Sequence, residues 1–377
     1  MSARQAEPEG PSVGAADAAA AFIACTARSG STLLRLLLDA HPELSCPSET
    51  DIAVLAASYV RIAEGLGLDP PEGRAGARRA VGELMGRYVA RRSTARWCDK
   101  SLSNVFHLPL LAELFPRATI ICLYRHGMDT IASGLQSSPW GLADYGFAQV
   151  AAMFPTNSVA ALAAYWVDRT ARMVDFADRH PDRCLQIRYE DLVADPAGVL
   201  GGCFERLGVA PMAPTTTFSS ATGGTGPGDY RIWYTDEVRS DAVGTGALLP
   251  VDQIGEPLRA QMNALLARLS YAVVDDWWGS GGGPSTRREA IALRITERNV
   301  LLSEVDLGPD APAAPPGAVV ALERDALVGL REGTENPGSA LRRRAVRLYG
   351  FGELDFSTER ALLAAVRRRL ARLDPPD

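Results

Sequence analysis

The chain lacks the apolar runs, cysteine pairs and leader features that would place it in a membrane or outside the cell. No apolar run approaches the roughly 20 residues of a membrane helix. The alanine-rich run 15–21 contains Asp17 and follows no strongly basic segment, so it is not typical of a secretion signal. The six cysteines form no C-x-x-C pair, which favours buried free thiols in a reducing cytosol over zinc or disulfides: Cys25, Cys46, Cys98, Cys122, Cys184 and Cys203. We therefore expect a cytoplasmic protein with no membrane partner.

An excess of positive charge is also missing. The formal net charge is -6 at pH 7, whereas general affinity for nucleic acid depends on neutralising phosphates with Lys and Arg. We therefore expect no nucleic-acid partner, although a local basic pocket for a small anion remains compatible with this charge. The composition, 47% hydrophobic and 22% charged, is that of a soluble globular protein. A length of 377 residues is enough for one large domain and an accessory piece.

Strands and helices alternate through the first part of the chain. Residues 1–18 mix Glu, Pro, Gly and Ala without periodicity and are predicted to form a disordered N-terminal lead. Short apolar runs predict strands at 21–24, 95–98, 118–124 and 184–189. Helical patterns lie at about 33–40, 49–92 with a break at 68–71, 104–115, 128–136, 158–179 and 196–207. This alternation predicts an α/β fold with a doubly wound parallel sheet and ligands at the carboxyl ends of its strands.

The remaining residues predict a loop, a linker and a second module. Residues 219–248 are rich in Gly, Ser, Thr and Asp and are interpreted as a long loop or lid. The segment 280–285 is the clearest linker, so the main domain is predicted to span 19–280. Residues 286–377 carry helical patterns around a Pro/Ala stretch at 309–316, which predicts a mainly helical C-terminal extension. Covering the site, binding a partner and forming a homodimer are the open alternatives for this accessory module.

The most informative stretch, Cys25 to Leu34, lies between the first predicted strand and its helix. A strand, a small hydroxyl-rich turn and a helix build an anion site, because the first N–H groups of the helix have no partners within it. Arg28 adds positive charge and Gly30 lets a phosphate approach the backbone. Three hydroxyl groups add donors: Ser29, Ser31 and Thr32. One glycine and no lysine stand in this turn, which departs from the P-loop of nucleotide kinases. Taken alone, the turn is equally compatible with an ordinary helix N-cap.

Further candidates follow the predicted strands. Arg125 ends the most apolar strand and Ser133 lies on the next helix, so the two are candidates to clamp one phosphate. Glu49 stands where a helix begins, Lys100 at the carboxyl end of the second strand, and Tyr189 at the end of another strand. Each has an ordinary alternative when taken alone: a surface arginine and a solvated serine, a first-turn acid, an exposed lysine and a core tyrosine.

As an ordered set, these motifs resemble the sulfotransferases that use 3′-phosphoadenosine 5′-phosphosulfate (PAPS), over about residues 22–271. The turn from Thr26 to Thr32 resembles the family's 5′-phosphosulfate loop, and Arg125 and Ser133 resemble its 3′-phosphate pair. Tyr189 resembles the tyrosine that lies near the adenine. The resemblance implies a P-loop-like three-layer α/β/α parallel sheet, the sulfotransferase fold.

Within that family, the segment from Arg28 to Thr50 is most similar to the tyrosylprotein sulfotransferases. Their catalytic glutamate and lysine correspond to Glu49 and Lys100. The resemblance therefore implies that Glu49 is the general base for the acceptor hydroxyl. It also implies that Arg28 and Lys100 stabilise the negative charge on the oxygen that bridges to the 5′-phosphate.

The resemblance implies ligand contacts as well. The turn residues Ser29, Gly30, Ser31 and Thr32 would hold the 5′-phosphate, and the pair that follows the apolar strand would hold the 3′-phosphate. Arg231 in the lid is a weaker candidate for the 3′-phosphate, and Thr235 is weaker still. None of the four histidines occupies a matching catalytic position: His41, His107, His126 and His180. No metal is implied.

Two departures from the tyrosylprotein enzymes concern the acceptor. The family's Cys-Gly-Glu-Glu-Thr is Cys-Pro-Ser-Glu-Thr at 46–50, and the lid at 223–246 resembles that of bacterial small-molecule sulfotransferases. We expect the acceptor to be a phenol or alcohol on a small natural product of secondary metabolism, with protein tyrosine as the alternative. A P-loop kinase for a small metabolite is the rival class, but it needs a loop lysine and Mg²⁺ ligands. A non-enzymatic binding protein is the third reading.

Overall fold

The computed structural model describes residues 20–135, 147–154, 157–212, 237–238, 243–249, 251–274, 291–297, 300–307, 319–332, 345–349 and 356–371, with positions 311, 334 and 340. Contacts divide the chain into two compact units. The first is Met1–Arg125 with Arg169–Arg239, and the second is His126–Asp168 with Ser240–Asp377. The predicted lead at 1–18, the linker at 280–285 and most of the lid lie outside the described residues, so the predicted domain boundaries stay predictions.

The first unit is built on a five-stranded parallel sheet with the strand order β2-β3-β1-β4-β5. The strands are β1 (Ala20–Cys25), β2 (Leu44–Ser45), β3 (Arg96–Lys100), β4 (Thr119–Tyr124) and β5 (Cys184–Arg188). Every residue of the central strand β1 is buried, as expected for a strand covered on both faces. Four of these strands match the predicted ones, whereas the two-residue β2 was not predicted.

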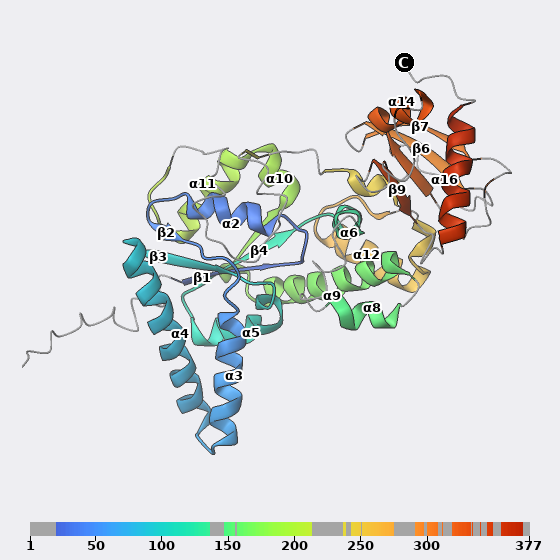
Figure 1. The fold of residues 1–377 in the computed structure, drawn as a ribbon. Coiled ribbons are helices and arrows are strands. Elements are labelled where there is room, and N and C mark those ends of the chain that lie inside the picture. Colours follow the sequence, from blue (N-terminus) through green and yellow to red (C-terminus); the bar gives the residue numbers. More distant parts are fainter. Residues whose placement is uncertain are drawn as a thin grey trace, which may run out of the picture. The chain divides into compact units, whose positions relative to one another are not determined.

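Helices cover both faces of this sheet (Figure 1). One face carries α2 (Ser31–Asp39), α10 (Tyr189–Ala194) and α11 (Pro196–Leu207). The other carries α3 (Ile52–Gly65), α4 (Pro70–Arg92) and α5 (Asn104–Leu114). This arrangement confirms the predicted P-loop-like three-layer α/β/α sheet.

The register of the parallel strands gathers the candidate residues at one edge of the sheet. Ile23 of β1 pairs with Lys100, the last residue of β3, and Cys25 pairs with Leu123 of β4. Because parallel strands end at the same edge, the turn after β1, Lys100 and Arg125 follow neighbouring strand ends. The sheet thus provides the rigid frame of the site.

The second unit contains the helices α6 (Gly127–Leu135), α8 (Ala148–Met153) and α12 (Glu256–Arg268), and the short 3₁₀ helices η4 (Thr245–Leu248) and η5 (Val251–Gln253). The boundary between the two units falls within α9 (Ser158–Arg179). Asp129 in the first turn of α6 is buried and accepts hydrogen bonds from the backbone N–H groups of Gly244 and Gly246, both at 2.8 Å. A Cβ atom at Gly246 would collide with the Met128 backbone. These contacts hold the end of the predicted lid against α6.

The C-terminal region differs from the prediction of a mainly helical extension, which was wrong. It holds a four-stranded mixed sheet with the order β7-β6-β8-β9, formed by β6 (Ala292–Glu297), β7 (Val300–Asp306), β8 (Val319–Glu323) and β9 (Val346–Tyr349). Two helices accompany it, α14 (Arg324–Glu332) and α16 (Phe356–Leu370). Leu293 and Ile295 of β6, and Val320 and Leu322 of β8, are buried at alternate positions. This period of two marks strands, and the prediction missed it because each run is short.

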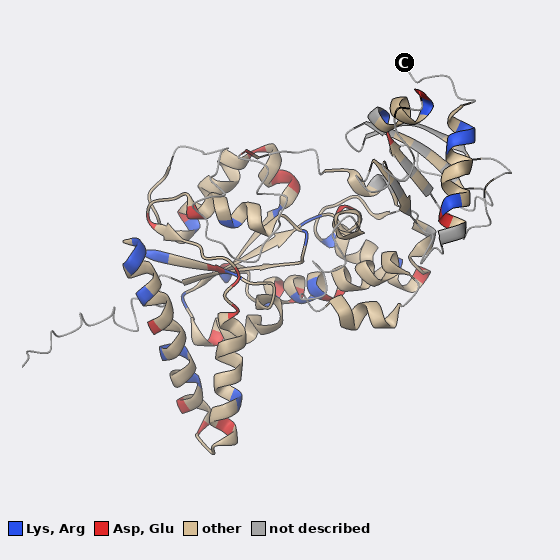
Figure 2. Ribbon diagram, viewed as in Figure 1, with Lys and Arg blue, Asp and Glu red and all other residues tan. Residues whose placement is uncertain are grey.

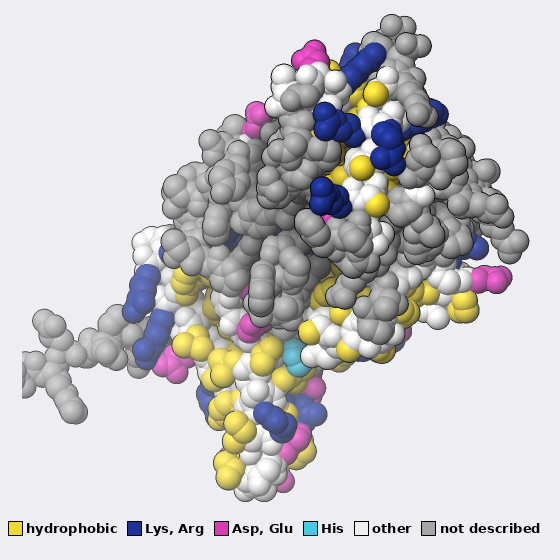
Figure 3. All heavy atoms as spheres, turned by 45° about the vertical axis from the view of Figure 1, so that its right-hand side comes forward, with side chains coloured by type: hydrophobic (Ala, Val, Ile, Leu, Met, Phe, Trp, Pro, Cys, Tyr) yellow, Lys and Arg dark blue, Asp and Glu magenta, His cyan; other side chains and the backbone are white. Residues whose placement is uncertain are grey.

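The last helix of the C-terminal region ends in a run of arginines. Arg367, Arg368 and Arg369 lie in the last turn of α16, where cations interact favourably with the helix dipole (Figure 2). Basic side chains also stand out on the surface of this region beside apolar ones (Figure 3). Among the described residues, no helix combines the length and the apolar character that crossing a membrane requires.

The aromatic cluster around Phe22 of β1 provides a test of the fold. Phe22 is fully buried and its ring lies 5.3 Å from that of Trp97 and 5.5 Å from that of Phe115. Phe22→Ala should lower the free energy of unfolding by about 3–5 kcal/mol, because it removes buried apolar surface and leaves a cavity. The control Ile62→Ala, at a side chain 58% exposed, should change it by less than about 0.5 kcal/mol. Urea unfolding followed by circular dichroism compares the two, and equal stabilities would contradict the central place of β1.

Candidate active site

The turn between β1 and α2 is closely packed and conformationally constrained. The Ser29 hydroxyl donates to the Thr26 carbonyl oxygen at 2.8 Å, which closes the turn. Arg28 and Gly30 both adopt left-handed backbone conformations, with φ of 69° and 87°. A Cβ atom at Gly30 would lie 2.7 Å from Cε2 of Tyr189, so only glycine fits at this position. The side chains that begin α2, Ser31 and Thr32, are buried. This geometry is that of the predicted anion turn, and a ligand contact from each of these residues stays a prediction.

The structure brings Arg125 and Tyr189 to this turn. Arg125 is buried and its Nη1 donates to the Arg28 carbonyl oxygen at 2.8 Å. Its guanidinium carbon lies 4.6 Å from the centre of the Tyr189 ring, a cation–π contact. Tyr189 does not end β5 as predicted but opens α10, because β5 stops at Arg188. The tyrosine therefore supports the turn, and its predicted place beside an adenine stays a prediction.

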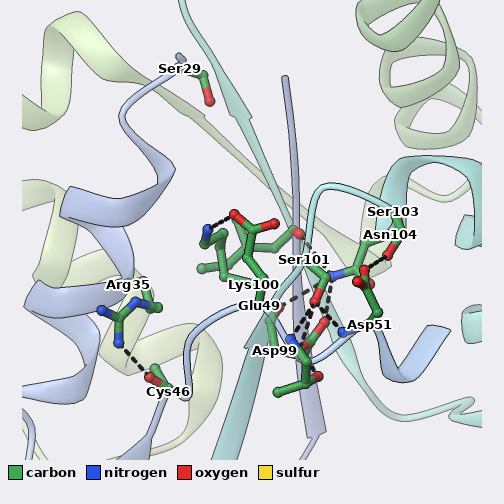
Figure 4. A network of polar contacts seen from close by, with 12 residues as sticks. Ser29, Arg35, Cys46, Glu49, Asp51, Asp99, Lys100, Ser101, Ser103 and Asn104 are labelled. Carbon is green, nitrogen blue, oxygen red and sulfur yellow. Dashed lines mark hydrogen bonds and ion pairs between the residues drawn. The ribbon is translucent and has the colours of Figure 1, made fainter. Parts of the chain in front are cut away.

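Glu49 and Lys100 form a buried ion pair. Lys100 Nζ lies 2.5 Å from Glu49 Oε1, and the side chains are 1% and 9% exposed (Figure 4). The ordinary readings are wrong for both residues: the lysine is not exposed at a strand exit, and the glutamate precedes α3, which begins at Ile52. Among the 39 Lys and Arg residues of the sequence, Lys100 is the only lysine.

The ion pair and the turn share the end of β1. Burial raises the pKa of the Cys25 thiol to about 11, while Lys100 and hydrogen bonds with Ser31 and Ser29 act in the opposite direction. Cys25 is therefore a neutral thiol at physiological pH and no nucleophile. Lys100 pairs in the sheet with Ile23, two residues before Cys25, so the ion pair lies near the base of the turn.

Sequence reasoning missed the buried carboxylate beside Lys100. Asp99 is fully buried, and burial raises the pKa of its carboxyl group while hydrogen bonds from Thr50, Asn104 and Ser101 oppose the rise. The available signal was a charged pair, Asp99 and Lys100, at the end of a strand that lies inside the sheet. Only Lys100 was selected as a candidate, because the family resemblance gave a role to Lys100 and none to Asp99.

The structure does not test the place of the remaining candidates relative to this edge. Ser133 is buried in α6, which belongs to the second unit, so its pairing with Arg125 stays a prediction. Arg231 and Thr235 lie outside the described residues. Two histidines bond to backbone groups instead of lining the site: His41 Nε2 lies 2.9 Å from the Ala210 carbonyl oxygen and His126 Nε2 lies 3.0 Å from that of Ala272. The described part of the chain contains no cluster of three or more potential metal ligands of the His, Cys, Asp or Glu type.

A parallel sheet with a glycine turn between its central strand and the following helix, and a buried carboxylate–lysine pair beside it, defines a P-loop-like α/β protein. The family model described as "Sulfotransferase family" matches residues 20–214, which include the turn, the ion pair, Arg125 and Tyr189. The chain belongs to the sulfotransferase family.

Individual proteins agree with this assignment. The chain is 28% identical over 187 residues to protein-tyrosine sulfotransferase 1 of Danio rerio, an alignment that covers 46% of this chain and 49% of the relative. It is 27% identical over 184 residues to protein-tyrosine sulfotransferase A of Caenorhabditis elegans, covering 46% of each. The chain thus spans about half the length of these curated relatives. The solved sulfotransferase domain from the curacin biosynthetic pathway shares the fold, with 21% identity, a TM-score of 0.50 and coverage of 67% of this chain and 97% of the domain.

The packing of Tyr189 on Gly30 yields a prediction. Gly30→Ala should lower the free energy of unfolding by about 1–3 kcal/mol, because it adds a Cβ to a left-handed residue and pushes it into the tyrosine ring. The matched control is Gly201→Ala in α11, where the added Cβ meets nothing within 4 Å. That variant should instead be more stable by up to about 1 kcal/mol, because alanine favours helix. Chemical unfolding measures both, and the same sign for the two variants would refute the packing argument.

Proposed function

We propose that this protein transfers a sulfuryl group from PAPS to the hydroxyl group of a phenol or alcohol. The observation that carries the proposal is the buried Glu49–Lys100 pair beside the turn after β1. A carboxylate can accept the proton of a hydroxyl nucleophile, and a buried ammonium can offset charge on a leaving oxygen. Membership in the sulfotransferase family supports sulfuryl transfer as the reaction.

The residues present fit an anionic donor. Arg125 and Lys100 are buried cations at the edge where the strands end, and α2 directs its first N–H groups out of the helix. Gly30 leaves no side chain over the turn. The Thr26 hydroxyl is buried and has no hydrogen-bond partner among the described residues, which favours a polar ligand at the turn. PAPS would supply the sulfuryl group, with 3′-phosphoadenosine 5′-phosphate as the leaving group.

In the proposed mechanism, Glu49 takes the proton of the acceptor hydroxyl at its carboxylate. Lys100 and Arg28 offset the negative charge that develops on the bridging oxygen, together with the N–H groups of the turn. Ser29, Ser31 and Thr32 hold the 5′-phosphate end of the donor. Arg125 and Ser133 hold its 3′-phosphate, and Tyr189 contacts its base.

The acceptor that we propose is a small natural product. The alternative, tyrosine in a protein or peptide, is favoured by the names of the curated relatives, which match less than half of this chain. Sulfate transfer from labelled PAPS to a panel of phenols and to tyrosine-containing acidic peptides decides between them. Selective labelling of the peptides would overturn the small-molecule assignment.

Ligand-induced stabilisation tests the donor. The product nucleotide 3′-phosphoadenosine 5′-phosphate (PAP) should raise the melting temperature by several degrees at saturating concentration. A hundredfold excess over Kd adds about 2.7 kcal/mol of stability when only the folded state binds. ATP with Mg²⁺ should leave the melting temperature unchanged within about 1 °C. Differential scanning fluorimetry provides the comparison, and the reverse pattern would favour the P-loop kinase class.

Substitution of the base tests the chemistry. Glu49→Gln should lower the rate of sulfate transfer about 10²–10⁴-fold, because the amide accepts no proton at neutral pH. Its affinity for PAP, measured by calorimetry, should stay within about threefold of the wild type, which also shows that the variant is folded. The control is Glu64→Gln at an exposed glutamate of α3, which should change neither quantity. Full activity of Glu49→Gln would remove the base assignment.

A further inference from the structure

The loop that carries Glu49 is tied down before the glutamate by α2. The backbone N–H of Cys46 donates to Asp39 Oδ1 at 2.7 Å. Arg35 Nη1 donates to the Cys46 carbonyl oxygen at 2.9 Å (Figure 4). Arg35 and Cys46 are both buried. Two side chains of one helix therefore fix both polar groups of a single peptide residue, three positions before the base.

The same loop is tied down after the glutamate by the end of β3. The Thr50 hydroxyl donates to Asp99 Oδ1 at 2.5 Å. The N–H groups of Thr50 and Asp51 donate to the Ser101 hydroxyl at 3.0 and 2.9 Å, and that hydroxyl donates in turn to Asp99 Oδ1 at 3.1 Å. Directly or through the Ser101 hydroxyl, all of these bonds connect the loop to Asp99 Oδ1 (Figure 4).

The second oxygen of Asp99 is anchored to the core. Asn104 Nδ2 donates to Asp99 Oδ2 at 2.9 Å, and its amide also reaches the Ile23 carbonyl oxygen at 3.1 Å. Asp99 thereby connects the loop to β1 and α5. A fully buried carboxylate is costly and persists only when donors surround it, which three different side chains do.

The geometry points to Asp99 as a positioning residue for the Glu49–Lys100 pair. It acts through its hydrogen bond with Thr50. Two consecutive residues of the loop, Glu49 and Thr50, bond to two consecutive residues of β3, Lys100 and Asp99. Because the two bonds share one register, the Thr50–Asp99 bond fixes where the Glu49 carboxylate lies relative to the lysine ammonium. The catalytic part of this inference rests on the proposed function.

Thr50→Val tests the role with little change in shape, because it replaces the hydroxyl group, which donates to Asp99 and accepts from the Ile52 N–H at 3.4 Å, by a methyl group. We expect the turnover number for transfer from PAPS to the phenol 4-methylumbelliferone to fall about 10- to 100-fold, as for a catalytic group displaced by a fraction of an ångström to 1 Å. The Kd for PAP, measured by calorimetry, should remain unchanged. Thr50→Ser keeps the hydroxyl and should restore turnover to within about twofold. Asp99→Asn is the second variant, and it should lower turnover with the same unchanged affinity for PAP.

The single lysine allows a readout that needs no acceptor. Protein labelled with [ε-¹³C]lysine gives one side-chain signal in a heteronuclear NMR spectrum, since Lys100 is the only lysine. The Glu49→Gln variant gives the chemical shift of this signal when the ion pair is broken. In Thr50→Val the chemical shift of the lysine signal should move from the wild-type value toward that of Glu49→Gln. In Thr50→Ser it should stay at the wild-type value.

The outcomes separate the two proposals. A lysine signal that stays at its wild-type position in Thr50→Val overturns the positioning role, whether or not any acceptor is turned over. Wild-type turnover in both Thr50→Val and Asp99→Asn overturns it as well. Absence of PAP binding to the wild type defeats the proposed function alone, because the lysine signal still reports on the loop.

Discussion

The buried ion pair between Glu49 and Lys100 is the interaction around which the candidate site of the first unit is arranged. Moving a carboxylate and an ammonium out of water costs several kcal/mol for each ion, and their attraction compensates only when the geometry is good. The chain meets this condition by pairing Lys100 with Ile23 in the sheet and by fixing the loop of Glu49 at both ends. A shifted register would leave one charge buried and unpaired. The sheet, the loop and the pair therefore specify one another.

The choice of lysine at this position is informative, because every other member of the 39 Lys and Arg residues is arginine. Guanidinium groups are planar and suit stacking and two-point contacts, as Arg125 shows against the ring of Tyr189. An ammonium group is compact and carries three donors on one nitrogen. One such nitrogen can face the Glu49 carboxylate and still offer donors to a second anion. A planar fork of five donors in the same buried space would leave several of them unsatisfied.

Much of the frame could be predicted from the sequence, because apolar runs such as 118–124 mark buried parallel strands and the hydroxyl-rich turn marks a helix start. The register could not, so nothing in spacing alone shows that Glu49 and Lys100, 51 positions apart, would touch. Resemblance to a family supplied both residues as catalytic candidates, but neither their contact nor Asp99. The strands around Leu293 and Val320 were missed because four to seven residues give too little periodicity to distinguish strand from helix.

The candidate active site and the C-terminal accessory module are built on different apolar cores. The family match ends at residue 214, and the turn, the ion pair and the Asp99 network all lie before that point. The C-terminal strands and helices bury a separate apolar cluster that includes Leu293, Leu322 and Leu362. No residue of the sheet β1–β5 belongs to that cluster, so we expect substitutions within it to leave the register that joins Lys100 to Glu49 unchanged. The module can therefore vary in sequence and role while the site that we assign to sulfuryl transfer keeps its geometry.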